Sequence, residues 1–301
     1  MDIPRFPEFL PLDLKHRDTI NTILWAYQPT TSELTFSNLF LWQAHYGLSW
    51  SLWEDRLILL AEPPQGEAWL LPPVGPPDRG ELCLRLLHWL GEAKGVAQPA
   101  IARADARLAG EVAAFPTIAC EPVREHFDYV YRSVDLINLA GNKYHGKRNH
   151  INSLRRSHPF RYQPLQAEHL DACLNLADRW CEFKRCEEDL NLTGEWEAIR
   201  LALRYCRELE LLGGVVLVRD KVEAFSLGEL LNQRTAVIHI EKANPELGAL
   251  YTLINQQFCQ HAWSEAELIN REQDLGEEGL RKAKLSYHPV HLEEKYLLQL
   301  R

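Results

Sequence analysis

Long apolar runs are missing from this sequence. Although 46% of the 301 residues are hydrophobic, Arg, Glu, Pro or Gly interrupts every apolar stretch before it reaches the roughly 18 to 20 residues that a membrane-spanning helix needs. The first residues, MDIPRFPEFLPLDLKHRD, place acidic residues and prolines where a signal peptide needs a basic stretch followed by an apolar one. We therefore expect no membrane span, no export signal and a soluble protein in the cytoplasm.

Paired cysteine motifs are missing as well. The seven cysteines contain no C-x-x-C pair, and an odd number without an export signal predicts free thiols. Cys181 and Cys186 with His169 are conceivable metal ligands, but their spacing matches no common zinc site and a helical context explains them. G-x-S-x-G, H-E-x-x-H and Cys/His nucleophile signatures do not occur either. We expect no metal site.

Basic residues are outnumbered, because the formal net charge is −9. Lys and Arg are also spread too evenly for a chain that binds nucleic acid with its whole surface, so any anion site must be local. One segment is the exception: from Lys143 to Arg161 there are six basic residues, three histidines and no acid. Such residues at a helix N-terminus or on one helical face suit the phosphate of a nucleotide, a phospholipid head group or a tRNA backbone. A solvated basic helix is the alternative. The predicted anion-binding residues are Lys143, Lys147, Arg148 and Asn149.

The length of the chain allows two domains, each with its own core. Hydrophobic periodicity predicts two sets of elements. In the first half these are helices over 13–27, 35–46, 81–93 and 105–114, and strands over 49–53, 56–61, 68–71, 99–103 and 127–133. In the second half they are helices over 168–184, 195–208 and 248–263, and strands over 160–164, 215–219, 222–229, 236–240 and 267–270.

The two halves also begin alike. The residues that recur at identical offsets are Pro11-Leu12, His16 and Asp18 in the first half, and Pro164-Leu165, His169 and Asp171 in the second. Together with the similar order of elements, this favours a tandem duplication. The composition changes from Asp135 onward, shortly before the basic segment from Lys143 to Arg161. We therefore predict domains over residues 1–134 and 135–301, with the site in the second.

Charged residues gather where two strands of the second half end, and the carboxyl ends of strands are where open α/β sheets bind ligands. After Val237 the first of these strands runs into His239, Glu241 and Lys242. Alternation places His239 and Glu241 on one face and Lys242 on the other. A glutamate on a core-facing side is costly unless it is paired or used. Glu241 is therefore a candidate base or ammonium-binding group, and a structural ion pair with a nearby arginine is the alternative.

The second of these strands ends at Asn270, Arg271 and Glu272. In the segment that follows, helical i, i+4 pairing explains Glu277, Glu278, Arg281 and Lys282, but it does not explain Asn270, Asp274 and Lys284. Between the two strands, the turn from Asn244 to Ala249 leads into a helix. Its free N–H groups could cradle a diphosphate near Gly248, with an ordinary helix-start turn as the alternative.

Four segments, TFSNLFLW, KYHGKRNHIN, HIEKA and INREQDLGEEGLRKAKLSYHP, together resemble a bacterial family grouped with the C-terminal domain of phosphatidylglycerol lysyltransferases. The resemblance spans nearly the whole chain. It implies a mixed-sheet α/β fold of two tandem GNAT-like acyltransferase domains, as in the Fem-type aminoacyltransferases. The lysyltransferases move a lysyl group from aminoacyl-tRNA to a lipid hydroxyl. The pattern of their active region matches Lys284, Tyr287 and Pro289, with Tyr296 beyond. The Gly248-Ala249 turn departs from the R/Q-x-x-G-x-G/A signature of GNAT enzymes.

These observations predict an acyl- or aminoacyltransferase. Lys143, Lys147 and Arg148 would hold an anionic donor, either aminoacyl-tRNA or acyl-CoA, and no other cofactor is implied. The nucleophile would be the amine or hydroxyl of a small-molecule, peptide or lipid head-group acceptor. Glu241 or Asp274 would orient or deprotonate it, and Lys284 or a backbone N–H would stabilise the oxyanion. The expected substrate contacts are His239, Lys242, Asn270, Arg271, Glu272, Arg281 and Tyr287.

Two alternatives stay open at this point. The chain could be a GNAT N-acyltransferase that uses acyl-CoA as its donor. It could also be a catalytically degenerate GNAT-like protein that only binds an RNA, lipid or protein partner.

Overall fold

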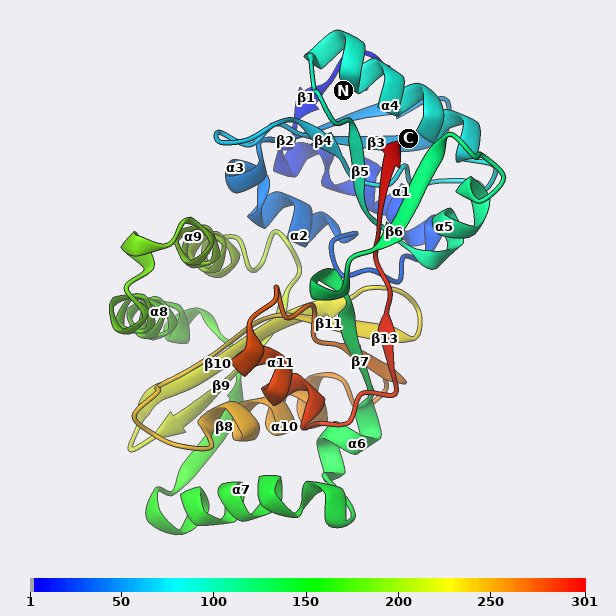
Figure 1. Cartoon of the computed structure of the whole chain (residues 1–301). Helices are drawn as coiled ribbons and strands as arrows, with labels where there is room; N and C mark the ends of the chain where they lie inside the picture. Colours follow the sequence, from blue (N-terminus) through cyan, green and yellow to red (C-terminus); the bar gives the residue numbers. More distant parts are fainter. Residues whose placement is uncertain (1–2) are drawn as a thin grey trace. The chain divides into compact units, whose positions relative to one another are not determined.

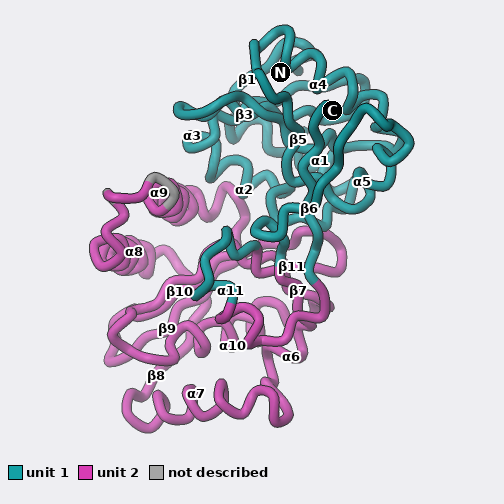
Figure 2. Tube along the Cα trace, viewed as in Figure 1, with its two compact units in different colours: residues 1–128, 273–281, 292–301 teal, residues 129–272, 282–291 magenta. Residues whose placement is uncertain are grey.

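The computed structural model describes residues 3–301, apart from the side chains of Glu187, Leu190 and Asn191. The chain forms two compact units (Figures 1 and 2). Unit 1 consists of Met1–Asp128, Gln273–Arg281 and Leu292–Arg301. Unit 2 consists of Tyr129–Glu272 and Lys282–His291. Each unit is built around a seven-stranded mixed sheet with helices packed against it.

The sheet of unit 1 has the strand order β1-β2-β3-β4-β5-β14-β6. Its strands are β1 (Leu10–Pro11), β2 (Leu48–Trp53), β3 (Arg56–Ala61), β4 (Trp69–Leu70), β5 (Ala100–Ala104), β6 (Ile118–Pro122) and β14 (Tyr296–Leu300). Its α-helices are α1 (Arg17–Tyr27), α2 (Phe36–Leu41), α3 (Gln43–Tyr46), α4 (Gly80–Lys94) and α5 (Ala106–Val112). The core is largely aliphatic, because α4 turns Leu86 and Leu90 toward Ile58, Ile101 and Leu298 of the sheet.

The sheet of unit 2 has the order β13-β7-β12-β11-β10-β9-β8. Its strands are β7 (Asp128–Arg132), β8 (Phe160–Pro164), β9 (Leu212–Val218), β10 (Lys221–Leu230), β11 (Thr235–Ala243), β12 (Leu268–Asn270) and β13 (His291–Glu293). Its α-helices are α6 (Ser133–Asn138), α7 (His145–Ser157), α8 (Leu170–Lys184), α9 (Leu190–Arg204), α10 (Leu250–Ala262) and α11 (Glu278–Leu285), the last of which begins in unit 1. Helix α10 contacts β9, β10 and β11, and α7 packs against α10.

The first five strands of the two sheets have the same order and directions. Reading from β1 in one sheet and from β8 in the other, the fourth and fifth strands are parallel in both, β4 with β5 and β11 with β12. Neighbouring strands before this pair are antiparallel in both sheets. The two units also begin alike. Each has a short strand, then a 3-10 turn that ends in a buried histidine, His16 or His169, and then a long helix.

The sixth strand of each sheet comes from a distant part of the chain. Strand β14 lies between β5 and β6 in unit 1, although it is the last strand of the sequence. Strand β7 lies beside β12 in unit 2, although it precedes residue 134. The two units therefore differ from the single predicted boundary between residues 134 and 135. Strand pairing over more than a hundred residues causes this difference, and no local pattern in the sequence reports it.

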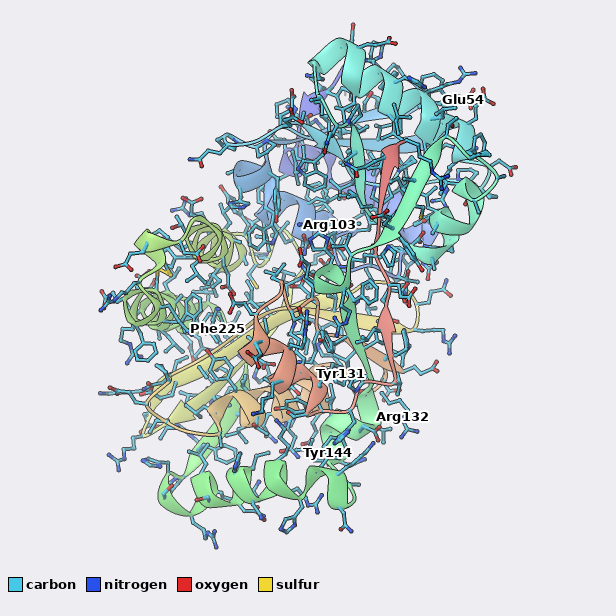
Figure 3. The ribbon with its side chains drawn as sticks, in the orientation of Figure 1. Glu54, Arg103, Tyr131, Arg132, Tyr144 and Phe225 are labelled. Carbon is cyan, nitrogen blue, oxygen red and sulfur yellow. A yellow bond between two sulfur atoms is a disulfide. The ribbon has the colours of Figure 1, made fainter. Side chains whose placement is uncertain are left out.

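Unit 1 also buries a charged network. Lys295 is fully buried, and its Nζ donates to Asp128 at 2.6 Å and to Glu33 at 2.8 Å. Burial acts to lower the pKa of Lys295, but the two carboxylates raise it. Figure 3 shows Arg103 in the same unit; its guanidinium lies 3.6 Å from Glu33 and stacks on Tyr46. Two cations thus balance two anions in the interior.

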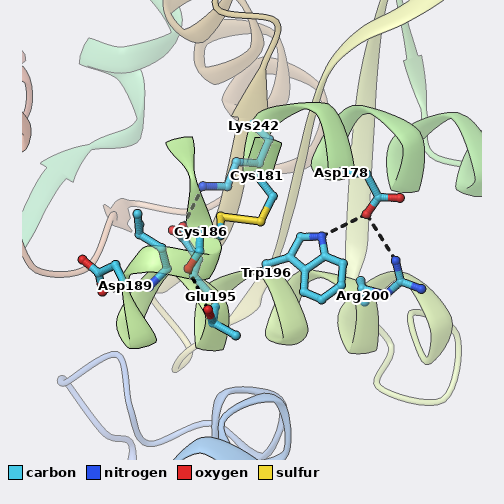
Figure 4. The surroundings of a disulfide bond; sticks show 10 residues. Asp178, Cys181, Cys186, Asp189, Glu195, Trp196, Arg200 and Lys242 are labelled. Atoms are coloured by element: carbon cyan, nitrogen blue, oxygen red, sulfur yellow. Dashed lines mark hydrogen bonds and ion pairs between the residues drawn. A yellow bond between two sulfur atoms is a disulfide. The ribbon is translucent and has the colours of Figure 1, made fainter. Parts of the chain in front are cut away.

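The prediction of free thiols is wrong for one pair of cysteines. Cys181, in the last turn of α8, forms a disulfide with Cys186 (Figure 4). Arg185 adopts a left-handed conformation at the end of α8, so the chain turns back and brings the two Cα atoms to 5.2 Å. The five other cysteines are free. His169 instead bonds to Gln163 and to the backbone of Gln166, so these three residues do not meet as metal ligands.

None of the helices within residues 3–301 is long and apolar enough to cross a membrane. The longest contain 15 residues.

Candidate active site in unit 2

The parallel strands β11 and β12 separate part of the way along their length. They pair only at Thr235, Ala236 and Val237 of β11, and β12 ends at Asn270, opposite Val237. Strand β11 continues to Ala243, so its last residues have no ladder partner in β12. The carboxyl ends of a parallel pair that separates in this way are the expected ligand-binding edge of an α/β sheet.

A β-bulge marks the point of separation. Ile240 pairs with Leu227 and Ile238 with Gly228, so His239 is the extra residue on β11. Bulges re-aim side chains and recur beside active sites. Position 228 must be glycine here, because a Cβ atom would lie 2.3 Å from the carbonyl oxygen of Val237.

His239 is held between two carboxylates. Its Nε2 lies 3.0 Å from Glu229 of β10, and its Nδ1 lies 2.8 Å from Glu272, just beyond β12. Burial acts to lower the pKa of His239, but the hydrogen bonds with Glu229 and Glu272 outweigh it and raise the pKa to about 10. The ring is therefore an imidazolium at neutral pH. It links β10 to the exit of β12 and fixes the separation of the strands.

Glu241 lies on the face of the sheet that α10 covers. Its Oε1 accepts from Nη2 of Arg271 at 2.8 Å, and its Oε2 accepts from Nδ2 of Asn255 at 2.9 Å. The side chains of Glu241 and Arg271 are 12% and 13% exposed, so the pair is mostly desolvated. The ion pair with an arginine that the sequence left open is thus present, and it holds a carboxylate at the strand end.

Aromatic rings surround the guanidinium of Arg271. Its Cζ lies 4.7 Å from the centroid of Tyr287 and 5.8 Å from that of Tyr131. Both rings are nearly fully buried. Tyr131 donates its hydroxyl to the backbone carbonyl of Lys284, and Tyr144 donates to that of Tyr287. Tyr131 and Tyr144 are labelled in Figure 3.

Lys284 fixes the backbone that carries Arg271. Its Nζ donates to the carbonyl oxygen of Arg271 at 2.6 Å and to that of Glu272 at 3.1 Å, and the residue is only 9% exposed. Asn270 supports the same turn by accepting from the N–H of Glu272 at 2.7 Å. The predicted oxyanion donor Lys284 is thus engaged with carbonyl groups of its own chain. We assign it a positioning role instead.

Lys147 approaches the same group from α7. It is half-buried, and its Nζ lies 3.8 Å from the centroid of the Tyr287 ring. Burial lowers the pKa of Lys147 to about 8, with a further contribution from the charge of Arg271 that Glu241 partly offsets. Within the described part of the chain, this ammonium has no ion pair and no hydrogen bond.

The other predicted anion-binding residues are placed differently. Lys143 lies 3.8 Å from Asp135, and Asn149 contacts the ring of His145 at 2.9 Å on the exposed surface. Arg148 donates to the carbonyl oxygens of Leu139 and Gly141, and so caps the end of α6. Of the four, only Lys147 lies near Arg271 and Tyr287.

Lys242 and Gly248 are not brought to this group either. Lys242 lies on the opposite face of β11, where its Nζ donates to Glu195 at 2.7 Å (Figure 4). The same Nζ sits 3.3 Å from the centroid of Trp180. This placement follows the predicted alternation. Gly248 belongs to the turn before α10, where Ala249 adopts a positive φ of 70° and caps the helix without a side-chain bond.

Asp274 and Arg281 belong to unit 1. Asp274 is fully buried and accepts from Arg281 at 2.8 Å, from Arg124 at 3.3 Å and from the N–H of Gly276 at 2.9 Å. These contacts make Asp274 the centre of an ion cluster in that unit. We therefore leave it out of the candidate site.

Sequence reasoning missed three residues of this site, namely Glu229, Tyr131 and Asn255. Asn255 is fully buried inside the apolar helix α10. A polar residue on a helix face that is otherwise apolar was the signal that could have found it. Tyr131 and Glu229 stand in strands where their partners come from other strands, and no local signal marks them.

The fold is that of a protein with two GNAT-like units in tandem, of mixed α/β class. The chain belongs to the family of the phosphatidylglycerol lysyltransferase C-terminal domain, whose model matches residues 26–299. The resemblance drawn from the four sequence segments is thereby confirmed.

Three solved structures are similar to this chain. A conserved protein of unknown function from Bacteroides thetaiotaomicron is 32% identical, with a TM-score of 0.90 over 97% of this chain and 99% of that one. L-PGS from Bacillus licheniformis is 14% identical, with a TM-score of 0.65 over 100% of this chain and 94% of that one. FemX is 9% identical, with a TM-score of 0.50 over 98% and 97% of the two chains. Comparison with curated proteins found no match.

Proposed function

We propose that this protein transfers an activated acyl group, specifically an aminoacyl group from aminoacyl-tRNA, to the amine or hydroxyl of an acceptor. One observation carries the proposal. A desolvated carboxylate, Glu241, lies beyond the point where β11 and β12 separate, held by Arg271 and Asn255. Membership in a family named for a lysyltransferase supports the aminoacyl donor.

The reaction needs a base beside the acceptor. The acceptor's nitrogen or oxygen attacks the carbonyl carbon of the aminoacyl ester and loses a proton as the new bond forms. The ester C–O bond then breaks, and the ribose hydroxyl leaves with a proton. Glu241 is the group that orients the acceptor and takes up its proton, because each carboxylate oxygen that accepts one hydrogen bond keeps a lone pair for another.

The surrounding residues set the geometry of this step. Arg271 fixes the orientation of the carboxylate, since a guanidinium nitrogen at 2.8 Å makes a charge-assisted hydrogen bond. Lys284 holds the backbone of Arg271, and His239 holds the turn at Glu272. A site supported in this way keeps its catalytic group in place before the substrate arrives, which lowers the reorganisation that the reaction needs.

A deacylation assay tests the proposal. The purified protein is mixed with tRNAs charged with radiolabelled amino acids, in the presence of pooled amine and hydroxyl acceptors, and the ester bond is followed over time. We expect loss of the ester and labelled product with at least one charged tRNA. A Glu241→Gln variant should lose about 100-fold or more of the rate, the range expected when a general base is removed.

The exposed residue Arg156 offers a matched control on α7. Arg156→Met removes a cation far from Glu241 and should leave the rate unchanged. If no charged tRNA is consumed with any acceptor, and the protein retains none of the tRNAs, the proposal is wrong. If acyl-CoA is consumed in a parallel reaction, the protein is a transferase with the other donor.

A further inference from the structure

One nitrogen of the Arg271 guanidinium has no partner. Nη2 donates to Glu241, but Nη1 is buried and makes no hydrogen bond within the described part of the chain. A buried donor of this kind costs roughly 1–3 kcal/mol, and more when it is charged, so its persistence in a native structure calls for an explanation.

A second cation nearby also lacks an anion. Lys147 and Arg271 contact the same aromatic ring, with Nζ at 3.8 Å and Cζ at 4.7 Å from the centroid of Tyr287. Among the described residues Lys147 has no carboxylate partner, and Glu241 is the one acid bonded to Arg271. The two cations and the one carboxylate carry a net charge of +1, so a further carboxylate group can be held between Lys147 and Arg271.

An acceptor atom is unpaired in the same group. Asn255 is fully buried, and its Nδ2 donates to Glu241, which fixes the orientation of the amide. Its Oδ1 therefore points away from Glu241, and it has no hydrogen-bond partner within the described residues. The two residues that hydrogen-bond to Glu241 thus each have an unsatisfied atom. In Arg271 it is the donor Nη1, and in Asn255 it is the acceptor Oδ1.

We propose that this group is the acceptor subsite, and that the acceptor is a free amino acid whose carboxylate lies between Lys147 and Arg271 and whose amine lies beside Asn255 and Glu241. This inference rests on the proposed transferase function and names its acceptor.

A monoanionic carboxylate fits this group better than a phosphate does. Nη1 of Arg271 and Nζ of Lys147 are donors without a hydrogen-bond partner among the described residues, and the two oxygens of a carboxylate can accept from one donor each. A phosphate dianion would also exceed the net charge of the group and would be repelled by Glu241. An ester-linked aminoacyl group has an amine but no carboxylate, so the carboxylate distinguishes the acceptor from the donor.

The test measures binding without tRNA. Each standard amino acid is screened singly against the full chain by thermal shift, and the one that binds best is measured by calorimetry beside its carboxamide and beside inorganic phosphate. We expect the acid to bind about ten-fold or more tightly than the amide, because one charge-assisted hydrogen bond is lost. In Lys147→Met, the acid should weaken about ten-fold and the amide should be unaffected.

The controls separate charge from folding. Methionine has a side chain of similar volume to lysine, and Lys147 is half-buried and makes no hydrogen bond among the described residues. The Lys147→Met variant should therefore fold. Lys147→Arg keeps the charge and should restore most of the preference for the acid. Arg156→Met, on the same helix, should bind both ligands as the unmodified protein does.

Three results would overturn the inference. They are no binding of any amino acid, equal binding of acid and amide, or binding of phosphate that Lys147→Met removes. Failure here is distinct from failure of the transferase function. Charged tRNA that is consumed with a hydroxyl or peptide acceptor, without amino-acid binding, keeps the transferase and removes this subsite. Amino-acid binding without any consumption of charged tRNA keeps the subsite and removes the transferase function.

Discussion

Arg271 and Glu241 form an ion pair across the gap that opens between β12 and β11, with Nη2 and Oε1 2.8 Å apart. Each residue follows the last ladder pair of its strand, Val237 with Asn270. The pair therefore bridges two strands at the point where their backbones stop bonding to each other. It stabilises the separated strand ends and leaves one guanidinium nitrogen unused.

The first prediction concerns the stability of this pair. Glu241→Ala leaves the charge of Arg271 buried without a carboxylate, so we expect a loss of about 3–5 kcal/mol in the free energy of unfolding. Glu241→Gln keeps one carbonyl oxygen that can accept from Arg271, so it should lose less. Urea unfolding followed by tryptophan fluorescence measures both values. A Glu241→Ala variant as stable as the unmodified protein would show that the charge of Arg271 is solvated in some other way.

His239 predicts a dependence of stability on pH. Its pKa is about 10 in the folded chain, against 6.5 for an unperturbed histidine. The stabilising contribution is therefore complete below pH 6.5 and is lost as the pH rises from 6.5 toward 10. His239→Gln removes this contribution, so the variant's free energy of unfolding should fall less steeply over that range. Parallel curves for the two proteins would contradict the imidazolium assignment.

The pKa shift of Lys147 changes stability with pH in the opposite direction to that of His239. Its pKa falls from 10.5 to about 8, so the unfolded chain binds more protons between these pH values and stability rises through them. The same shift makes the amine reactive. Pulse labelling with acetic anhydride and peptide mass spectrometry should give half-maximal labelling of Lys147 near pH 8. The midpoint should move to about 10.4 in urea, where the neighbours are lost.

Lys284 tests the assignment of a positioning role. Lys284→Met removes the ammonium that two backbone carbonyls share, so we expect a loss of about 1.5–3 kcal/mol in stability. Hydrogen exchange of the amides from Leu268 to Glu272 should speed up, and transfer should fall with it. An unchanged exchange rate together with lost transfer would indicate instead that Lys284 contacts the reacting atoms.

A fifth prediction concerns unit 1. Lys295→Met leaves Asp128 and Glu33 buried without their ammonium, which should cost about 3–5 kcal/mol in the free energy of unfolding. Adding Asp128→Asn to the same chain should recover part of this loss, because one uncompensated charge is removed. The double variant measured by urea unfolding decides between a coupled network and two independent contacts. Additive losses would contradict the coupling.

Much of the secondary structure follows from local pattern. The strand predicted over 160–164 is β8, and the helix predicted over 168–184 corresponds to a 3-10 turn followed by α8. Alternation along β11 also separated Glu241 from Lys242 correctly, because successive side chains of a strand point to opposite faces. The charged strand ends from His239 to Glu241 and from Asn270 to Glu272 were visible in the sequence because charged residues follow apolar strands there.

Long-range pairing decided the rest. The sequence by itself determined the acidic composition, the family segments and the type of elements such as β8 and α8, whose residue patterns are local. Only the tertiary structure placed β14 in the sheet of unit 1 and joined Cys181 to Cys186. It also brought Lys147, alone among the basic residues from Lys143 to Arg161, against the ring of Tyr287. The physical reason is that a buried charge is defined by partners that are distant in sequence. The sequence therefore did not distinguish Arg271 from the other charged residues of its segment. The structure did, because it places Glu241 and Tyr287 against its guanidinium and Asn255 against Glu241.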